Sequence, residues 1–294
     1  MAESLEQTPA LTVIMPAHNE AGRVGKVVQA VHERYPQAEI VVVDDASTDD
    51  TTAEAAAAGA TVVRHPYNKG NGAAVKTGLR NAHGRHVLLM DADGQHDPAD
   101  IPRLLEPLAE YDLVVGARDP NTQASWLRRL GNSAFNSLAT YVAGRPIPDL
   151  TSGFRAARRE AIREFIHLLP NGYSYPTTST LAFFKAGYSV AFVPVQSGRR
   201  GGGKSGVRLL RDGARFVLII LRIATLFSPL KVFFPASVGL FLLSCLSAGY
   251  TIATEGRLHI PNSAVVLFTM SVIVFLIGLV SEQIAMLRFE GKER

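Results

Sequence analysis

The sequence predicts a doubly wound, mostly parallel α/β sheet, followed by an amphipathic juxtamembrane segment and two transmembrane helices. Short apolar runs alternate with segments of helical periodicity up to about residue 195, which is the pattern of βαβ units. Several of these runs are uniformly apolar, as expected of strands that are buried on both faces. Two uncharged stretches near the C-terminus are each long enough to span a bilayer.

The elements of the first half follow from these periodicities. Strands are expected at the short apolar runs, over residues 11–15, 39–43, 61–64, 87–90 and 112–116. Helices are expected where apolar residues recur at helical spacing or where capping residues open a segment, over 24–35, 50–58, 70–82 and from 98 onward. Pro16 is expected to stop the first strand. Ser, Thr and Asp residues after the second strand are expected to cap the following helix.

The pattern is looser beyond Arg118. A helix is expected over 125–143, and a loop over 146–155 enters a short strand. Two further helices and one strand are expected over 158–168, 177–186 and 188–195. A basic, glycine-rich loop over 196–206 closes this region.

The chemistry of the chain changes after residue 206. We expect a catalytic domain over 1–206, an amphipathic segment over 207–230, a two-helix hairpin over 231–285 and a tail over 286–294. Arg257 is the one Lys or Arg between the two apolar stretches, whereas basic residues flank them on both outer sides. The positive-inside rule therefore predicts a protein of the inner cell membrane with two spans, and with the catalytic domain and both termini in the cytoplasm. Two core helices of a soluble protein are the less favoured alternative.

Composition excludes several classes. The single cysteine, Cys245, allows no internal disulfide, and the first ten residues carry two Glu and no basic residue, unlike a signal peptide. The net charge of +4 is too small to indicate a nucleic-acid partner. Basic residues instead gather in one segment that we expect to face phosphates or an anionic membrane: Arg199, Arg200, Lys204, Arg208, Arg211, Arg215 and Arg222.

Two carboxylates follow the strand over 87–90. In extended backbone, side chains two residues apart point the same way, so Asp91 and Asp93 are expected on one side at the carboxyl end of the strand. Open α/β sheets bind ligands at that edge. Carboxylates without neighbouring Cys ligands favour Mg²⁺ or Mn²⁺ over zinc, and such an ion commonly bridges to a diphosphate. A solvated acidic turn is the alternative interpretation.

The same edge is expected to gather polar residues from four strands. They are Asn19, Glu20, Asp44, Asp45, Asp91, Asp93 and Arg118. The histidines carry no metal-ligand spacing, so we expect His65, His83 and His86 at the surface or at strand ends. His96 is expected near the site, where a solvated turn is favoured over a position behind the metal ligands.

Seven motifs, in order, resemble those of the polyprenyl-phosphate glycosyltransferases of glycosyltransferase family 2, the group that includes dolichol-phosphate mannosyltransferase. They are PAHNE over 16–20, VDDASTD over 43–49, NKGNGA over 68–73, DADGQ over 91–95, GAR over 116–118, DLTSGFR over 149–155 and RR with KS over 199–205. The resemblance covers residues 11–206 and implies a catalytic domain of the GT-A type. The paired C-terminal spans resemble those of the membrane-anchored bacterial members.

The resemblance implies roles for particular residues. The nucleotide-sugar site would be formed by Pro16, Ala17, His18, Asn19, Glu20, Val43, Asp44, Asp45, Lys69, Gly70, Asp91, Ala92, Asp93 and Gln95. Asp91, Asp93 and Gln95 would hold the metal and the diphosphate. The acceptor and its phosphate would be bound by Arg118, Arg128, Arg129, Ser133, Arg199, Arg200 and Lys204. Asp149 occupies the family's catalytic-base position, and it is expected to act either as a base or as a carboxylate that orients the acceptor site.

The expected reaction is the transfer of one sugar from a UDP- or GDP-linked donor to undecaprenyl or dolichyl phosphate, for cell-envelope or glycoconjugate synthesis. A divalent ion at Asp93 would stabilise the leaving diphosphate. A phosphate monoester has a second pKa of about 6, so a lipid phosphate needs positioning more than deprotonation. Arginine suits this task because its planar fork matches phosphate oxygens. No second nucleophilic carboxylate is evident, which favours inversion by single displacement. The sequence leaves open whether the protein forms a homo-oligomer.

A different class of protein is indicated by one further pattern. The sequence GRRGGGKS over 198–205 matches the P-loop of nucleotide triphosphatases and lies between an expected strand and an expected helix. The protein would then be a membrane-associated NTPase, in which Lys204 contacts the nucleotide phosphates and Asp91 is the Walker-B aspartate at the end of an apolar strand. This alternative leaves the acidic strand end at Asp44 and Asp45 unexplained.

Overall fold

The computed structural model describes residues 10–118, 126–172, 174–195, 225–256 and 260–290, without the side chains of 126–132, 134 and 288–290. The chain divides into two compact units, Met1–Gly206 and Val207–Arg294.

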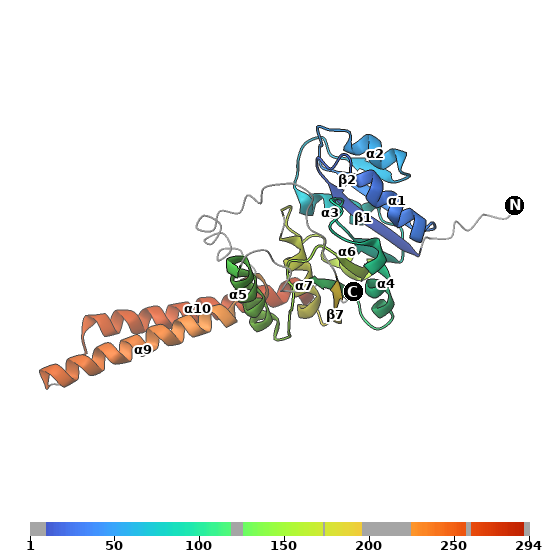
Figure 1. The fold of residues 1–294 in the computed structure, drawn as a ribbon. Coiled ribbons are helices and arrows are strands. Elements are labelled where there is room, and N and C mark those ends of the chain that lie inside the picture. Colours follow the sequence, from blue (N-terminus) through green and yellow to red (C-terminus); the bar gives the residue numbers. More distant parts are fainter. Residues whose placement is uncertain (1–9, 119–125, 173, 196–224, 257–259, 291–294) are drawn as a thin grey trace. The chain divides into compact units, whose positions relative to one another are not determined.

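In its described residues, the first unit is built on a seven-stranded sheet with the order β3-β2-β1-β4-β6-β5-β7. Figure 1 shows β1, β2 and β7 among the helices of this unit. The strands are β1 Leu11–Ala17, β2 Glu39–Asp44, β3 Thr61–Arg64, β4 His86–Leu89, β5 Leu113–Arg118, β6 Arg155–Arg158 and β7 Val190–Val195. All neighbouring pairs are parallel except those of β6, which runs antiparallel between β4 and β5. The prediction of a mostly parallel, doubly wound sheet is confirmed.

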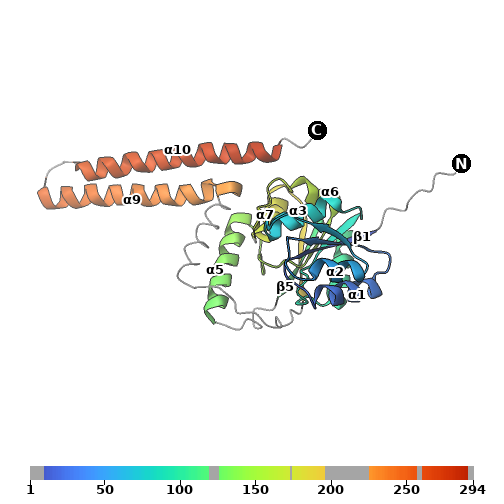
Figure 2. The ribbon, with the colours of Figure 1, turned by 90° about the horizontal axis from the view of Figure 1, so that it is seen from above.

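Helices cover both faces of this sheet. They are α1 Val24–Arg34, α2 Thr51–Ala57, α3 Asn71–Asn81, α4 Ile101–Leu105, α5 Trp126–Ala143, α6 Arg159–Glu164 and α7 Tyr175–Lys185. Figure 2 shows α1 and α2 on one side of β1 and α3 and α6 on the other. The segment expected as a helix from Pro98 contains α4 between two 3₁₀ turns, Pro98–Asp100 and Glu106–Ala109. The helix expected over 158–168 is shorter in the structure.

The main core lies between the sheet and the face that carries α1. Val24, Val27, Val28 and Val31 are all buried along one side of α1, as their spacing predicts. They pack in one cluster with alternate residues of β1, including Met15. On the opposite face, the backbone of α3 lies close to β1, because a side chain at Gly78 would overlap Ile14.

The first strand does not stop at Pro16, contrary to the prediction. β1 pairs with β2 as far as Ala17, whereas its pairing with β4 ends at Ile14. The Ile14 carbonyl accepts a hydrogen bond from Met90 N on the β4 side, and Pro16 faces the same way two residues later. Because β4 has ended there, no ladder hydrogen bond is lost by the missing N–H of proline.

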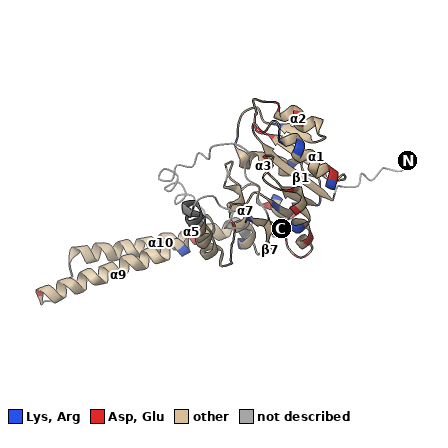
Figure 3. Ribbon diagram, in the orientation of Figure 1, with Lys and Arg blue, Asp and Glu red and all other residues tan. Residues whose placement is uncertain are grey.

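The second unit contains two long apolar helices, α9 Leu230–Glu255 and α10 Asn262–Glu290. Both are long and apolar enough to cross a membrane. Figure 3 shows the Lys, Arg, Asp and Glu residues gathered on the first unit, while most of this hairpin carries none. Much of the predicted amphipathic segment lies outside the described residues.

Hydroxyl groups join the two helices of the hairpin. Ser244 Oγ donates to the Ala264 carbonyl and Ser271 Oγ donates to the Ser237 carbonyl, each at 2.8 Å. A methyl group at Gly278 would lie 2.6 Å from Phe233 Cβ, so glycine permits close packing there. Small residues and interhelical hydrogen bonds of this kind are the contacts that hold helices together in lipid.

Candidate active site

A pocket of about 290 Å³ opens at the carboxyl ends of β1, β2 and β4, beside the first turn of α3. It is lined by Pro16, Ala17, His18, Glu20, Asp45, Asn68, Gly70, Asn71, Ala74, Asp91, Ala92, Asp93 and Gln95. The structure therefore brings Asp45, Asp91 and Asp93 to one cavity, although they are far apart in the sequence.

The residues that line the pocket differ at several positions from the nucleotide-sugar site that the sequence predicts. Asn19, Val43, Asp44 and Lys69 were expected in the nucleotide-sugar site but do not line the pocket. The walls instead include three residues that the site prediction omitted, Asn68, Asn71 and Ala74. Asn68 and Asn71 belong to the NKGNGA motif, and their places on either side of Gly70, which was assigned to the site, could have indicated that they line the pocket.

Asp44 and Asn19 join the loops that form the pocket wall. Asp44 is fully buried; its Oδ1 accepts from Ser47 N at 2.8 Å and its Oδ2 accepts from the Thr52 hydroxyl. Burial raises the pKa of the Asp44 carboxyl, but these hydrogen bonds outweigh it and hold the pKa below its usual range. Asn19 Oδ1 accepts from Thr48 N at 2.9 Å, so the loop after β1 is tied to the loop after β2.

Asp45 is held from three directions. Its Oδ1 accepts from His65 Nδ1 at 2.7 Å and from Lys69 N at 2.8 Å, and its Oδ2 accepts from Gly70 N at 2.7 Å. Burial raises the pKa of Asp45, and these donors lower it by more, so the carboxyl is held ionised. His65 lies at a strand end, directly after β3, as one of the two predicted positions has it, but it is 5% exposed and therefore not at the surface. The imidazole of His65 is buried because it packs against Asp45, a contact between distant residues that the spacing in the sequence does not indicate.

Asp91 and Asp93 reach the pocket from a turn and not from an extended strand. β4 ends at Leu89, and Gly94 has a φ of +77°, a conformation that favours glycine. Asp93 Oδ1 accepts from Gln95 N at 3.0 Å, which fixes the turn. The prediction of strand geometry was wrong, but the turn still leaves both carboxylates in the pocket lining.

His96 lies behind Asp91 and is buried. Its ring stacks on Phe154 with a centroid distance of 4.7 Å, and its Nε2 lies 3.7 Å from Asp91 Oδ2. The expectation of a solvated turn was therefore wrong, because Phe154 from the DLTSGFR motif covers the imidazole. Among the described residues, His96 Nδ1 is one of the few buried side-chain nitrogen or oxygen atoms without a hydrogen-bond partner.

Arg118 and Asp149 form an ion pair outside the pocket lining. Arg118 Nε donates to Asp149 Oδ2 at 2.8 Å and Nη2 donates to Oδ1 at 3.1 Å. The backbone N of Arg118 reaches Oδ2 at 3.2 Å, and Thr151 N reaches Oδ1 at 3.0 Å. Burial raises the pKa of Asp149, but the hydrogen bonds and charge of Arg118 hold it below its usual range. Both oxygens of Asp149 are thus occupied.

A fully buried guanidinium lies next to this region. Arg155 Nη1 donates to the Pro176 carbonyl at 2.9 Å and to Ser179 Oγ at 2.7 Å, and its Nε donates to the Ser152 carbonyl at 3.2 Å. Burial lowers the pKa of Arg155 to about 10. A side chain at Gly153 would lie 3.2 Å from Asp91 Oδ2, so the DLTSGFR segment packs directly against the acidic turn.

The acidic edge suits a divalent ion whose coordination is completed by oxygens of the substrate. Among the described residues, no group of three His, Cys, Asp or Glu side chains could hold a metal alone. Asp91, Asp93 and Gln95 nevertheless offer oxygen donors to one pocket. Mg²⁺ is commonly bound by one or two carboxylates together with substrate phosphates and water, so this donor set fits Mg²⁺ or Mn²⁺ bridged to a diphosphate.

The predicted acceptor residues are only partly placed. Arg118 pairs with Asp149, and Ser133 is exposed on α5. Arg128 and Arg129 also belong to α5, but their side chains lie outside the described residues. Arg199, Arg200 and Lys204 lie outside the described residues as well.

The sheet, the acidic pocket and the motifs agree with comparisons to known proteins. Residues 12–166 match the glycosyl transferase family 2, so the chain belongs to that family and is a glycosyltransferase. Residues 228–287 match the GtrB C-terminal hairpin. The resemblance predicted from the motifs is thereby confirmed.

The relatives include proteins named for lipid-phosphate substrates. Glycosyltransferase AglJ of Haloferax volcanii is 28% identical over 97% of both chains. Polyprenol monophosphomannose synthase of Mycolicibacterium smegmatis is 34% identical over 65% of this chain and 78% of its own. Undecaprenyl-phosphate mannosyltransferase of Micrococcus luteus is 30% identical over 65% of this chain and 85% of its own.

A solved structure shows the same fold. Glucosyl-3-phosphoglycerate synthase from Mycobacterium tuberculosis, in complex with Mn²⁺ and UDP-glucose, has a TM-score of 0.58 at 24% identity, covering 74% of this chain and 78% of that one. The GT-A-like fold is thus confirmed. None of these findings supports the P-loop alternative, and residues 198–205 lie outside the described residues.

Proposed function

We propose that this glycosyltransferase transfers one sugar from a nucleotide sugar to a polyprenyl phosphate at the cytoplasmic face of the inner cell membrane. The observation that carries the proposal is the meeting of Asp45, Asp91 and Asp93 in one pocket at the carboxyl edge of the sheet. The names of the relatives support a polyprenyl-phosphate acceptor. The two apolar helices support a membrane location.

In this proposal the pocket binds the donor. Asp45 and the PAHNE segment contact the nucleoside, and Asp91, Asp93 and Gln95 would hold Mg²⁺ or Mn²⁺. A bound ion would supply Lewis-acid stabilisation of the leaving diphosphate. The turn fixed by Gln95 N and Gly94 keeps the two carboxylates in place before substrate arrives, so little reorganisation is needed during the reaction.

The acceptor phosphate is the nucleophile, and its oxygen displaces the nucleoside diphosphate from the anomeric carbon with inversion. The phosphate is largely ionised at neutral pH, so its attack needs no strong base. Asp149 suits an orienting role better than that of a base, because Arg118 and Thr151 already occupy both of its oxygens. Arg118, oriented by Asp149, contributes positive charge beside the pocket. Basic residues of α5 and of the 199–204 segment complete the acceptor site.

The test uses the full chain in liposomes with a panel of UDP- and GDP-linked sugars and a short polyprenyl phosphate. Mass spectrometry is expected to find one sugar added per lipid phosphate, and NMR of the product gives the anomeric configuration. Protease accessibility of the N-terminal unit in oriented membrane vesicles tests the cytoplasmic placement. Absence of lipid-linked sugar with every donor would contradict the proposal, as would unchanged turnover after chelation of divalent ions.

A further inference from the structure

The hydrogen bonds of Asp45 leave few positions for a ligand. An ionised carboxylate offers about four lone-pair positions, two on each oxygen. Oδ1 accepts from His65 Nδ1 and Lys69 N, and Oδ2 accepts from Gly70 N. Three of the four positions are therefore used inside the protein, and the one that remains is on Oδ2. Asp45 lines the pocket, so this position is the one that a ligand can use.

His65 cannot easily turn away from Asp45. A carboxylate only accepts hydrogen bonds, so His65 Nδ1 carries the hydrogen and donates it. The other nitrogen, Nε2, faces the hydroxyl of Thr77 on α3 at 2.9 Å. Because the ring is buried and held at both nitrogens, His65 joins β3, α3 and the end of β2 in one fixed arrangement.

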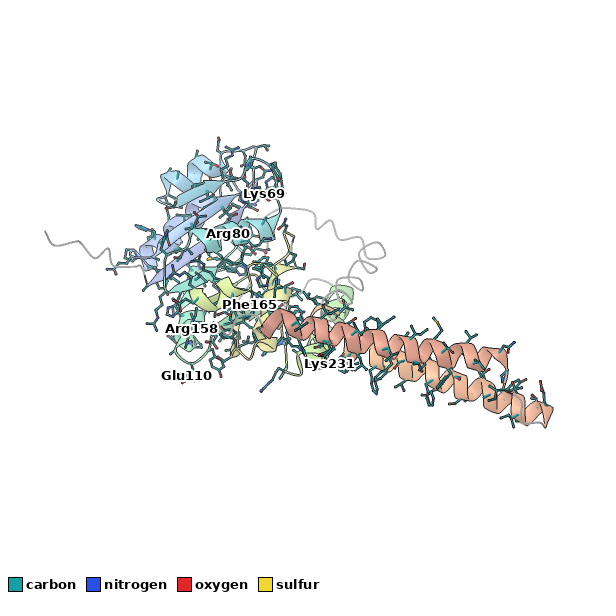
Figure 4. The ribbon with its side chains drawn as sticks, turned by 180° about the vertical axis from the view of Figure 1, so that it is seen from behind. Lys69, Arg80, Glu110, Arg158, Phe165 and Lys231 are labelled. Carbon is teal, nitrogen blue, oxygen red and sulfur yellow. The ribbon has the colours of Figure 1, made fainter. Side chains whose placement is uncertain are left out.

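The two backbone N–H groups that donate to Asp45, those of Lys69 and Gly70, are also fixed in position. Gly70 has a φ of +98°, and a side chain there would lie 2.6 Å from the Asn171 carbonyl oxygen. The same carbonyl accepts from Ala73 N at 3.1 Å, so residues around 171 hold the start of α3. Figure 4 labels Lys69 beside α3, at the end of the unit opposite Arg158 and Glu110. The acceptor pattern of Asp45 is thus set before a ligand binds.

We propose that His65 is a specificity-determining positioning residue: by occupying Oδ1, it leaves Asp45 one open acceptor position, which selects a nucleobase whose recognition edge carries one N–H donor in total. This proposal rests on the nucleotide-sugar function above. Uracil and thymine carry one such donor, N3–H, between two carbonyl groups. The chain is therefore assigned a uracil-type donor in preference to a guanine one.

Guanine fits this acceptor pattern poorly. Its N1–H and N2 amino donors lie side by side, and a carboxylate that recognises guanine needs one open position on each oxygen. Here the second donor would meet Oδ1, which already accepts two hydrogen bonds, and would be left unpaired. Cytosine and adenine present an unprotonated ring nitrogen to Asp45, which repels the carboxylate. An unpaired buried polar group commonly lowers affinity by about ten- to a hundredfold.

The test measures binding of UDP, GDP and CDP to the full chain in detergent with Mn²⁺, by calorimetry. UDP is expected to bind at least about tenfold more tightly than GDP or CDP, and N3-methyl-UDP is expected to lose most of the affinity of UDP. GDP binding as tight as UDP binding would overturn the proposal, as would full affinity for N3-methyl-UDP.

Variants separate selectivity from folding. His65→Leu frees a position on Oδ1, so the ratio of UDP to GDP affinity is expected to fall several-fold, whereas His65→Asn keeps a donor near the same place and is expected to retain the ratio. His83→Leu is the matched control, because His83 Nδ1 also lies 2.7 Å from a carboxylate oxygen, on Glu39 at the opposite end of β2. An unchanged ratio in His65→Leu, with wild-type thermal stability, would assign His65 a purely structural role.

The two proposals fail in different ways. If sugar is transferred to lipid phosphate but GDP-linked donors are preferred, the base assignment is wrong and the transferase function stands. If no nucleoside diphosphate binds and no donor is used, the proposed function is wrong and the base assignment fails with it.

Discussion

The guanidinium of Arg118 meets the carboxylate of Asp149 with two nitrogens on two oxygens, at 2.8 and 3.1 Å. Asp149 is buried, whereas the side chain of Arg118 is one third exposed, at 33%. The carboxylate therefore fixes one side of the guanidinium and leaves part of it accessible. An arginine positioned in this way is suited to bind a phosphate oxygen.

This pairing predicts non-additive effects of substitution. If Asp149 acts by orienting Arg118, Arg118→Ala and Asp149→Ala should each lower kcat/KM on the order of 10²-fold, and the double variant should lose little more. If Asp149 were an independent base, the two losses would multiply. Steady-state kinetics with varied lipid phosphate decides between these outcomes. Thermal unfolding of each variant shows whether the loss reflects instability of a broken ion pair.

Metal dependence is expected to rest on the acidic turn. Asp93→Asn should weaken Mn²⁺-dependent binding of the nucleotide at least about tenfold, because a neutral amide is a poorer ligand for a hard cation. Asp50→Asn is the control, since Asp50 is exposed on a neighbouring acidic loop and does not line the pocket. Titration of Mn²⁺ followed by electron paramagnetic resonance measures this directly. Equal Mn²⁺ affinity in wild type and Asp93→Asn would remove Asp93 from the metal site.

His96 is expected to position Asp91. His96→Phe keeps an aromatic ring against Phe154 but removes the nitrogen that lies 3.7 Å from Asp91 Oδ2. We expect the Mn²⁺ concentration for half-maximal activity to rise about tenfold, as for other residues that orient metal ligands, with little change in thermal stability. His86→Phe, at the start of β4, provides the control. A parallel loss in both variants would indicate a general effect of removing histidine from this strand region.

The start of α3 is expected to tolerate no side chain at residue 72. A methyl group on Gly72 would overlap the carbonyl oxygen of Pro170 and lie 2.6 Å from that of Gly172. Gly72→Ala should therefore lower the free energy of unfolding by about 1–3 kcal/mol and weaken nucleotide binding. Gly172→Ala is the matched control, because nothing lies within 4 Å of a methyl group there. Equal melting temperatures for both variants would contradict this packing.

The strands that carry the site were predictable because their signals are local. Uniform apolar runs marked β1, β2 and β4, and the acidic residues that follow them defined the binding edge. β6 was predicted only as a short strand of unstated direction. In its place between β4 and β5 it buries Arg155, whose guanidinium donates to a carbonyl and a hydroxyl oxygen of α7 that no local pattern reveals.

The burial of site histidines was not predictable for the same reason. His65 follows Arg64, and His96 lies between Gln95 and Asp97; these polar neighbours favour exposure. Their burial results from partners distant in the sequence, Asp45 for the first and Phe154 for the second. Spacing shows which residues share an element, but it does not show which side chain from another element will cover them.

The buried carboxylates predict loss of stability in acid. The pKa values of Asp44, Asp45 and Asp149 are all held below their usual range, because hydrogen-bond donors outweigh the effect of burial. Below the usual aspartate pKa of about 4, the unfolded chain binds more protons than the folded chain, so the free energy of unfolding falls as pH falls through the folded values. Thermal unfolding followed by circular dichroism should thus show a melting temperature that is insensitive to these groups above about pH 5 and drops toward pH 3.

Asp44→Asn should make the drop shallower, whereas Asp50→Asn, exposed on the same loop, should not. An equal slope in Asp44→Asn and wild type would show that Asp44 does not carry this dependence.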